Sequence, residues 1–411
     1  MTYQYNIATS KKDSRSNVSL LVCHALTDII TLFLSTFLIA HIYSVTQGVS
    51  NYIFNVGVYE TSMYVAVAVA YFIMSPIVQR TNRIWIYRLA LALRAILVIF
   101  VVFFGENLSD MIVFAGALNG ISYGCYLASY NVIRQEMVSR NSMNSFLAFS
   151  SIVSKTLSIV APIVIGSLID ISTFSQVAIY VAVICIIQII VSLGISSKRP
   201  ENSTYNLKQY LNRLKTNPAK NKIKHVYLTY IAYGTTTIVG TLLTVCVMME
   251  FGSNFSLGAI TSIISAVSVV VLILFSKFTK PGKRAWLFIV LSILPLSSLL
   301  VVFLPSTYSV VIYQVCMGIA MIILNPTLAA YRNGNLKEAG LYDCIDEHQS
   351  VVELIMAVCR IVGFVLLMLI GASGNLVLFK VLLGLTSLSY SAVLISLLIY
   401  EKKYSVNNKT E

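Results

Sequence analysis

The chain has 411 residues, of which 57% are hydrophobic and only 11% are charged, and its mean hydropathy is +0.82. Soluble domains carry roughly 25% charged residues, and one soluble core cannot bury this much apolar surface. The composition therefore excludes an ordinary soluble protein and indicates an integral membrane protein. A net charge of +13 can also indicate nucleic-acid binding, so its meaning depends on where the basic residues lie.

Apolar runs of about 20 residues follow one another along the chain, and each is long enough to cross a hydrocarbon core of roughly 30 Å as a helix. None alternates as the strands of a membrane barrel do, so we expect helices. The second run is the least uniformly apolar, because it begins with the partly polar stretch "NVGVYETSMY". The twelve predicted spans are 17–42, 55–78, 84–104, 111–132, 145–169, 175–195, 226–249, 256–276, 286–304, 309–330, 351–372 and 375–400.

Basic residues occur in both tails, in the long middle connector and in every second loop. The remaining loops, among them "ENLSD", "ISTFSQ", "FGSNFS" and "GASGN", contain no Lys or Arg. Under the positive-inside rule, both termini and the connector lie in the cytoplasm of a protein that crosses the cell (plasma) membrane many times. The net positive charge then reflects the orientation of the chain in the membrane. Its expected partners are anionic lipids, and nucleic acid is excluded.

The order of the elements is six helices, a basic connector and six more helices. The two halves have similar sequences at corresponding positions. The fourth span ends with "LASYNVIRQEMV", and the tenth ends with "LAAYRNGNLKEAG". The loop after the second span reads "SPIVQRTNR", and the loop after the eighth reads "SKFTKPGKR". This organisation resembles the major facilitator superfamily, which implies an all-α fold of two pseudo-symmetric six-helix bundles. We place the boundaries at 1–16 (N-terminal tail), 17–195 (first bundle), 196–225 (basic linker), 226–400 (second bundle) and 401–411 (C-terminal tail).

The family's signature loop, Gly-x-Leu-x-Asp-Arg-x-Gly-Arg between helices two and three, is only partly present. Arg80 and Arg83 match its basic positions, whereas Gln79 replaces the acid. The resemblance implies gating loops in which that acid links the two halves, so its loss leaves the link in question. In the second half the matching residues are Lys280, Gly282 and Lys283, with Thr279 in the acidic position.

Charged residues also occur deep inside the predicted spans. Lys155 stands in "SSIVSKTLSIVAPIVIG", about ten residues or 15 Å from the cytoplasmic end of its helix, and Asp28, Arg94 and Arg360 lie at similar depth. An ionised side chain there costs at least roughly 2.5–3.5 kcal/mol, so such residues face a cavity or pair with one another. Asp28 can neutralise Arg94 or Lys155, but one acid cannot satisfy three bases.

Other charged positions have simpler interpretations. Glu353 is placed to serve Arg360, and Lys380 to extend toward the headgroups. Arg94 lies on helix three, which is peripheral in the family. We expect Glu60, near the outer end of helix two, to be an interfacial residue.

Polar stripes run along the helices that line the central cavity in the family. Helix four presents Asn119, Tyr123 and Tyr126, and helix ten presents Asn325. Helix seven presents Thr237, Thr241 and Thr244, although hydroxyls at this spacing also serve helix packing. Proton-coupled exporters carry a Gly-Pro-x-x-Gly-Gly motif in helix five, and this chain keeps its proline and one glycine as Pro162 and Gly166. The alternative is that Pro162 only bends the helix.

No phosphate-binding loop, His pair with metal spacing or catalytic set is present, so we expect no enzyme, cofactor or metal site. The sequence predicts a secondary transporter that works by alternating access, favoured as a proton-coupled exporter of a small amphiphilic or anionic compound. Lys155 and Arg360 would bind its anionic group beside the polar stripes, and Asp28 and Glu353 would carry the coupling proton. The alternatives are a nutrient importer and a transporter-derived receptor or immunity partner that moves no solute.

Overall fold

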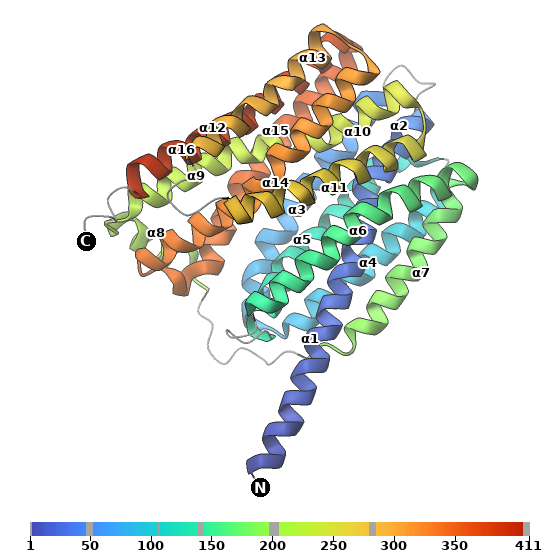
Figure 1. The fold of residues 1–411 in the computed structure, drawn as a ribbon. Helices are drawn as coiled ribbons and strands as arrows, with labels where there is room; N and C mark the ends of the chain where they lie inside the picture. The colour runs from blue at the N-terminus through green and yellow to red at the C-terminus, as the bar shows by residue number, and fades with distance from the viewer. Residues whose placement is uncertain are drawn as a thin grey trace.

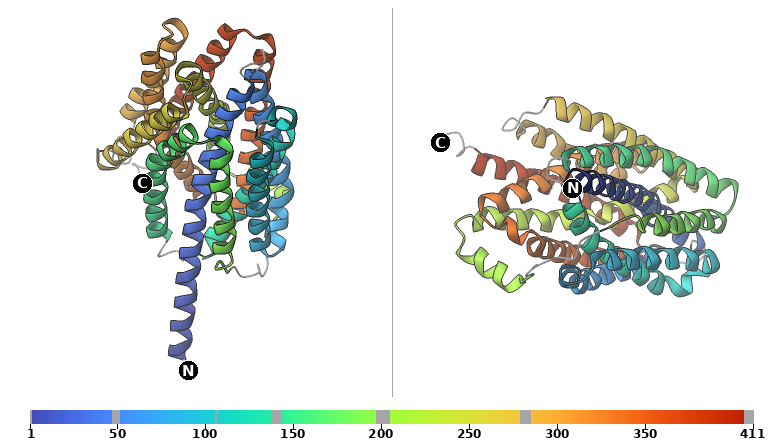
Figure 2. Two further views of the ribbon diagram at one scale, coloured as in Figure 1. Left: turned by 90° about the vertical axis from the view of Figure 1, so that its right-hand side faces the viewer. Right: turned by 90° about the horizontal axis from the view of Figure 1, so that it is seen from below.

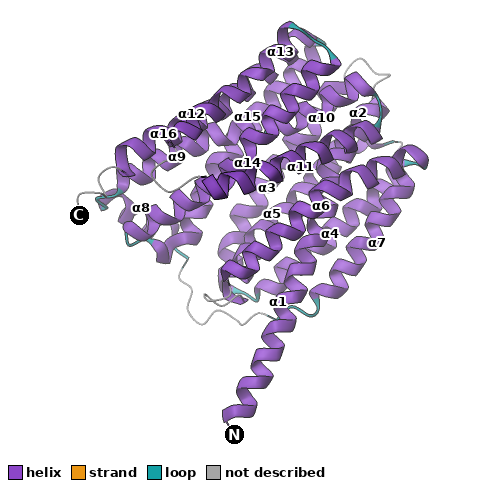
Figure 3. Ribbon diagram, viewed as in Figure 1, coloured by secondary structure: helices purple, strands orange, loops and turns teal. Residues whose placement is uncertain are grey.

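The computed structural model describes residues 2–46, 52–105, 107–137, 143–196, 205–278 and 285–405. Within these ranges every regular element is a helix and no strand occurs (Figure 3). Eleven helices are long and apolar enough to cross a membrane, and a shorter apolar helix covers Thr307–Met321. The prediction of an all-α membrane protein is confirmed, and the predicted count of twelve spans is close to the count in the described ranges.

The first span is built from three helical pieces, because a π-helical turn, η1 (Phe33–Phe37), interrupts it. Turns of this kind are rare and occur frequently at functional sites. The elements of the first half are α1 (Thr2–Leu32), η1, α2 (Leu38–Thr46), α3 (Tyr52–Arg80), α4 (Arg83–Phe104), η2 (Leu108–Met111), α5 (Ile112–Met137), α6 (Met143–Ile171) and α7 (Phe174–Ser192).

A short helix in the middle connector precedes the second half. The elements from there on are α8 (Leu207–Thr216), α9 (Lys220–Thr236), α10 (Ile238–Phe251), α11 (Asn254–Phe278), α12 (Ala285–Ile293), η3 (Leu294–Ser297), α13 (Ser298–Phe303), α14 (Thr307–Glu338), η4 (Tyr342–Cys344), α15 (Ile345–Ser373), α16 (Leu376–Tyr400) and η5 (Glu401–Ser405). The predicted linker 196–225 is therefore partly helical.

Several helices extend beyond the predicted spans. The helix α1 begins at residue 2 instead of 17, α9 at 220 instead of 226, and α14 continues to 338 instead of 330. Hydropathy detects only the part of a helix that lies in hydrocarbon, whereas backbone hydrogen bonding continues into the polar turns beyond it. Both chain termini lie at the same end of the bundle (Figures 1 and 2). We call it the terminal end and the opposite end the far end.

Two helix pairs join the halves: α3 packs along α15, and α6 packs along α11 (Figure 1). Small residues allow the α6–α11 backbones to come close, as is common between membrane helices. A Cβ on Gly258 would lie 2.2 Å from the carbonyl oxygen of Pro162, and one on Gly166 would lie 2.3 Å from that of Asn254. Pro162 and Gly166 thus form part of the contact between the halves.

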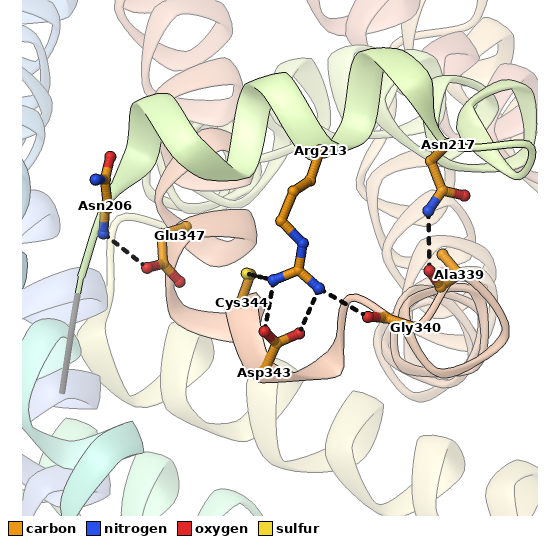
Figure 4. Close-up of polar contacts among 8 residues, drawn as sticks. All are labelled: Asn206, Arg213, Asn217, Ala339, Gly340, Asp343, Cys344 and Glu347. Carbon is orange, nitrogen blue, oxygen red and sulfur yellow. Dashed lines mark hydrogen bonds and ion pairs between the residues drawn. The ribbon is translucent and has the colours of Figure 1, made fainter. Parts of the chain in front are cut away.

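The connector helix α8 is held against the second half (Figure 4). Arg213 donates to both carboxylate oxygens of Asp343, at 2.5 and 3.3 Å, and to the Gly340 carbonyl at 3.1 Å. At one end of α8 the Asn206 amide donates to Glu347 (2.9 Å), and at the other Asn217 donates to the Ala339 carbonyl (2.9 Å). The connector therefore joins the α14–α15 turn as part of the second half.

Candidate functional site

A cavity of about 320 Å³ lies between α1 and α6, and Asp28 and Lys155 both line it. The Ser154 hydroxyl donates to the Asp28 carboxylate at 2.5 Å. The helical turn that places Ser154 against α1 also brings Lys155 to the cavity wall, since the two are adjacent on α6. The structure therefore brings together two of the four charged residues that the sequence places at mid-depth.

Arg94 lies behind this cavity and is only 2% exposed. Its guanidinium donates to the Thr31 hydroxyl (3.3 Å), and Thr31 lines the cavity. The rings of Tyr126 and Tyr123 lie 5.5 and 5.9 Å from the guanidinium carbon, within the range of cation–π attraction. The expectation of a peripheral Arg94 is wrong, because α4 packs against α5 and turns this residue inward.

The polar stripe of α5 makes contacts within the first half. Asn119 donates to the Tyr59 hydroxyl on α3 at 2.8 Å. The Tyr126 hydroxyl lies 3.2 Å from Nδ1 of His24 on α1. Each of these buried polar groups thus has a partner, as burial away from water requires.

Arg360 and Glu353 form an ion pair on α15, with 3.8 Å between nitrogen and oxygen. Arg360 also donates to the Thr237 hydroxyl (3.2 Å), and its guanidinium lies 5.3 Å from the centre of the Tyr64 ring. Gln349 donates to Glu353 at 2.8 Å. The cavity beside this pair has only about 10 Å³, so Arg360 and Glu353 occupy a packed site distinct from the one around Lys155.

Sequence reasoning missed the placement of Glu60. The side chain is 4% exposed, not interfacial, and Thr241 of the second half donates to its carboxylate at 3.0 Å. Both residues line a cavity of about 200 Å³ between the halves. The expectation of an interfacial Glu60 is wrong, because residues of the first span and of α10 enclose the side chain. The polar run "YETSMY" inside a predicted span was the available signal.

The altered signature loop still joins the two halves. Gln79, in the position of the family acid, donates through Nε2 to Asp346 at the start of α15, and its Oε1 accepts from Arg83 at 3.5 Å. Close by, the hydroxyls of Ser75 and Ser350 are 3.2 Å apart. The acid missing from the loop is thus replaced by a carboxylate from the other half, with Gln79 between it and the guanidinium.

Two further predicted residues, Arg80 and Lys380, lie apart from the contacts described above. Arg80 is exposed at the terminal end, and Lys380 is half-buried near the far end of α16. Lys280, Gly282, Lys283 and the side chain of Asn325 lie outside the described residues. In the described part of the chain, no group of three or more His, Cys, Asp or Glu side chains is placed to hold a metal ion.

Comparison with known proteins agrees with this architecture. The family model described as Major Facilitator Superfamily matches residues 18–342. The uncharacterized protein YqgE of Bacillus subtilis (strain 168) is 26% identical over 151 residues, or 34% of this chain, so the chain matches about a third of that relative's length, 35%.

Solved structures resemble nearly the whole chain. A POT family transporter in complex with 5-aminolevulinic acid has a TM-score of 0.68 at 12% identity, covering 95% of this chain and 96% of that one. The nucleoside transporter NupG has a TM-score of 0.63 at 13% identity, with coverage of 96% and 99%. The human organic anion transporter MFSD10 has a TM-score of 0.62 at 13% identity, with coverage of 93% and 99%. The match of the family model across most of the chain, together with this shared fold, shows that the chain belongs to the major facilitator superfamily and is a multi-pass membrane transporter of that type.

Proposed function

We propose that the chain is a proton-coupled secondary transporter that exports a small amphiphilic or anionic compound by alternating access. The observation that carries this proposal is the 320 Å³ cavity lined by both Asp28 and Lys155. Its volume is in the range of small-molecule sites, and an ammonium group on its wall is suited to an anion. We include Arg360, Asn119, Tyr123, Tyr126 and Asn325 in the proposed binding surface, as the sequence predicts.

Proton coupling requires a group that binds and releases a proton as the site opens to each side. Asp28 is placed for this role, because it accepts a hydrogen bond from the Ser154 hydroxyl and lines the cavity. Glu353 is the second candidate, since it is already paired with Arg360 and borders only the small cavity of about 10 Å³. We therefore assign the coupling proton to Asp28 first.

The substrate class rests on Lys155 and not on the solved relatives. Those proteins are described as transporters of organic anions and of nucleosides, and as a complex with 5-aminolevulinic acid. At 12–13% identity such likeness concerns the fold alone. A thermal-shift screen of the purified protein against a library of metabolites and drugs identifies the compound, and a flux assay separates export from import.

We also propose that the terminal end faces the cytoplasm, because the basic residues gather there. After replacement of the seven native cysteines, a cysteine at Asn107 should react with an impermeant maleimide added to intact cells, whereas one at Lys215 should not. Asn107 lies at the far end, and Lys215 is exposed on α8. Reaction of the α8 position in intact cells would reverse the orientation.

Asp28→Asn should abolish accumulation driven by a pH gradient in proteoliposomes while leaving solute-for-solute exchange active. The amide keeps the shape of the carboxyl and still accepts from Ser154, but it cannot carry a proton. Asp110→Asn, at the far end of the bundle, is the matched control and should accumulate normally. Undiminished accumulation by the Asp28 variant would move the coupling proton elsewhere, with Glu353 the next position to test.

Lys155→Met should weaken binding of the anionic compound about tenfold or more, since a hydrogen bond to a charged group contributes about 1.5–3 kcal/mol. The separate variant Lys155→Arg should also bind the compound weakly, because a planar guanidinium does not replace the ammonium group in a fitted site. Lys380→Met, which removes a half-buried lysine of α16, is the control. The measurement is ligand affinity by titration calorimetry, and equal affinity in wild type and Lys155→Met contradicts the assigned role.

The contact between Gln79 and Asp346 should hold the terminal end closed. Gln79→Asp places two carboxylates together, at a cost of several kcal/mol, so a cysteine introduced at the buried Ser350 should react with maleimide about tenfold faster or more. Combining Gln79→Asp with Asp346→Gln exchanges the two groups and should return the reaction to its slow rate. Slow labelling in the single variant would show that the contact does not close this end.

A further inference from the structure

Glu60 borders a space that both halves of the protein enclose. The cavity of about 200 Å³ is lined by Glu60 and Tyr64 from α3, by Ser35 from η1, and by Thr241 and Thr244 from α10. Its wall is thus one carboxyl group, several hydroxyls and aromatic ring surface. A group bound here contacts both halves at once.

The carboxyl group of Glu60 is not fully satisfied by protein. It accepts a hydrogen bond from the neutral Thr241 hydroxyl, and among the described residues it belongs to no ion pair. A carboxylate has about four acceptor positions, and an ionised one away from water is costly without a positive partner. The free space beside it has room for such a partner.

The Glu60 cavity adjoins the Lys155 cavity. Ser35, in the π-helical turn of the first span, lines both of them and is exposed despite its position in the middle of the membrane span. The wider turn of a π-helix changes which side chains face the interior at this level. A buried acid and an amine therefore line two neighbouring cavities that share Ser35 as a lining residue.

We propose that Glu60 binds a positively charged amine of the transported compound, so that the substrate is a small zwitterion whose acidic group is held at Lys155. This inference rests on the proposed function, in which Lys155 binds an anionic group. Because Thr241 and Thr244 come from the second half, the bound amine also joins the two halves across the cavity.

The test uses purified full-length protein and two matched series of ligands. One series is straight-chain ω-amino acids of three to six carbons, and the other is the fatty acid salts of the same lengths. Titration calorimetry should show at least one ω-amino acid binding wild type about tenfold or more tighter than its matched fatty acid, the gain of one charge-assisted contact.

Glu60→Gln keeps the size of the side chain and its bond with Thr241, so it should lower ω-amino acid affinity to that of the fatty acid and leave fatty acid affinity unchanged. Glu60→Asp should retain part of the preference. Glu250→Gln, an exposed acid at the far end, is the control and should behave as wild type. Lys155→Met should weaken both series equally.

The inference is overturned if wild type binds the two series equally, if it binds neither, or if Glu60→Gln keeps the preference for the amine. Failure of the proposed function looks different: fatty acids bind wild type, and Lys155→Met leaves that binding unchanged. Loss of accumulation in Glu60→Gln with an intact preference for the amine would make Glu60 a proton carrier and would also overturn the inference.

Discussion

The cost of removing an ionised side chain from water governs the interior of this protein. Hydrocarbon offers no hydrogen bonds, so each buried charge must find a partner inside the bundle. Arg94 meets this demand with Thr31 and two tyrosine rings, and Arg360 meets it with Glu353, Thr237 and a third ring. Asp28, Lys155 and Glu60, by contrast, line the cavities of about 320 and 200 Å³.

The same constraint shapes the contact between the halves. Small residues bring the α6 and α11 backbones together, and polar groups join α3 to α15 at the terminal end. Further along, Glu60 of α3 accepts a hydrogen bond from Thr241 of α10. Neutral hydroxyl and amide contacts can break and reform as two rigid bundles move, at less cost than an ion pair whose charges would be left unpaired. Gln79 illustrates this, since it links Arg83 to Asp346 while carrying no charge itself.

The two cavities meet where the first span departs from regular helix. A π-helical turn at this point brings Ser35 to both spaces, and the residues that line them come from both bundles, mainly from α1, α3, α6 and α10. The site that we propose there would therefore involve both bundles, as alternating access requires. The connector helix α8 is fixed to the α14–α15 turn through Arg213 and Asp343 and therefore moves with the second half.

The sequence alone determined the class of the protein, the approximate position of each span and the depth of its buried charges, because hydropathy and rise per residue are properties of the chain taken one residue at a time. It also placed Asp28 at the depth of both Arg94 and Lys155, whereas the cavity that Asp28 shares with Lys155 came from the structure. Only the tertiary structure decided that Glu60 is buried, that Arg94 faces inward and that Asp346 replaces the missing loop acid. The rotation of a helix about its own axis and the identity of the helix packed against it depend on residues far away in the chain. The rotation of the helix and the identity of its neighbour decide whether a charged side chain faces lipid, a partner residue or a cavity.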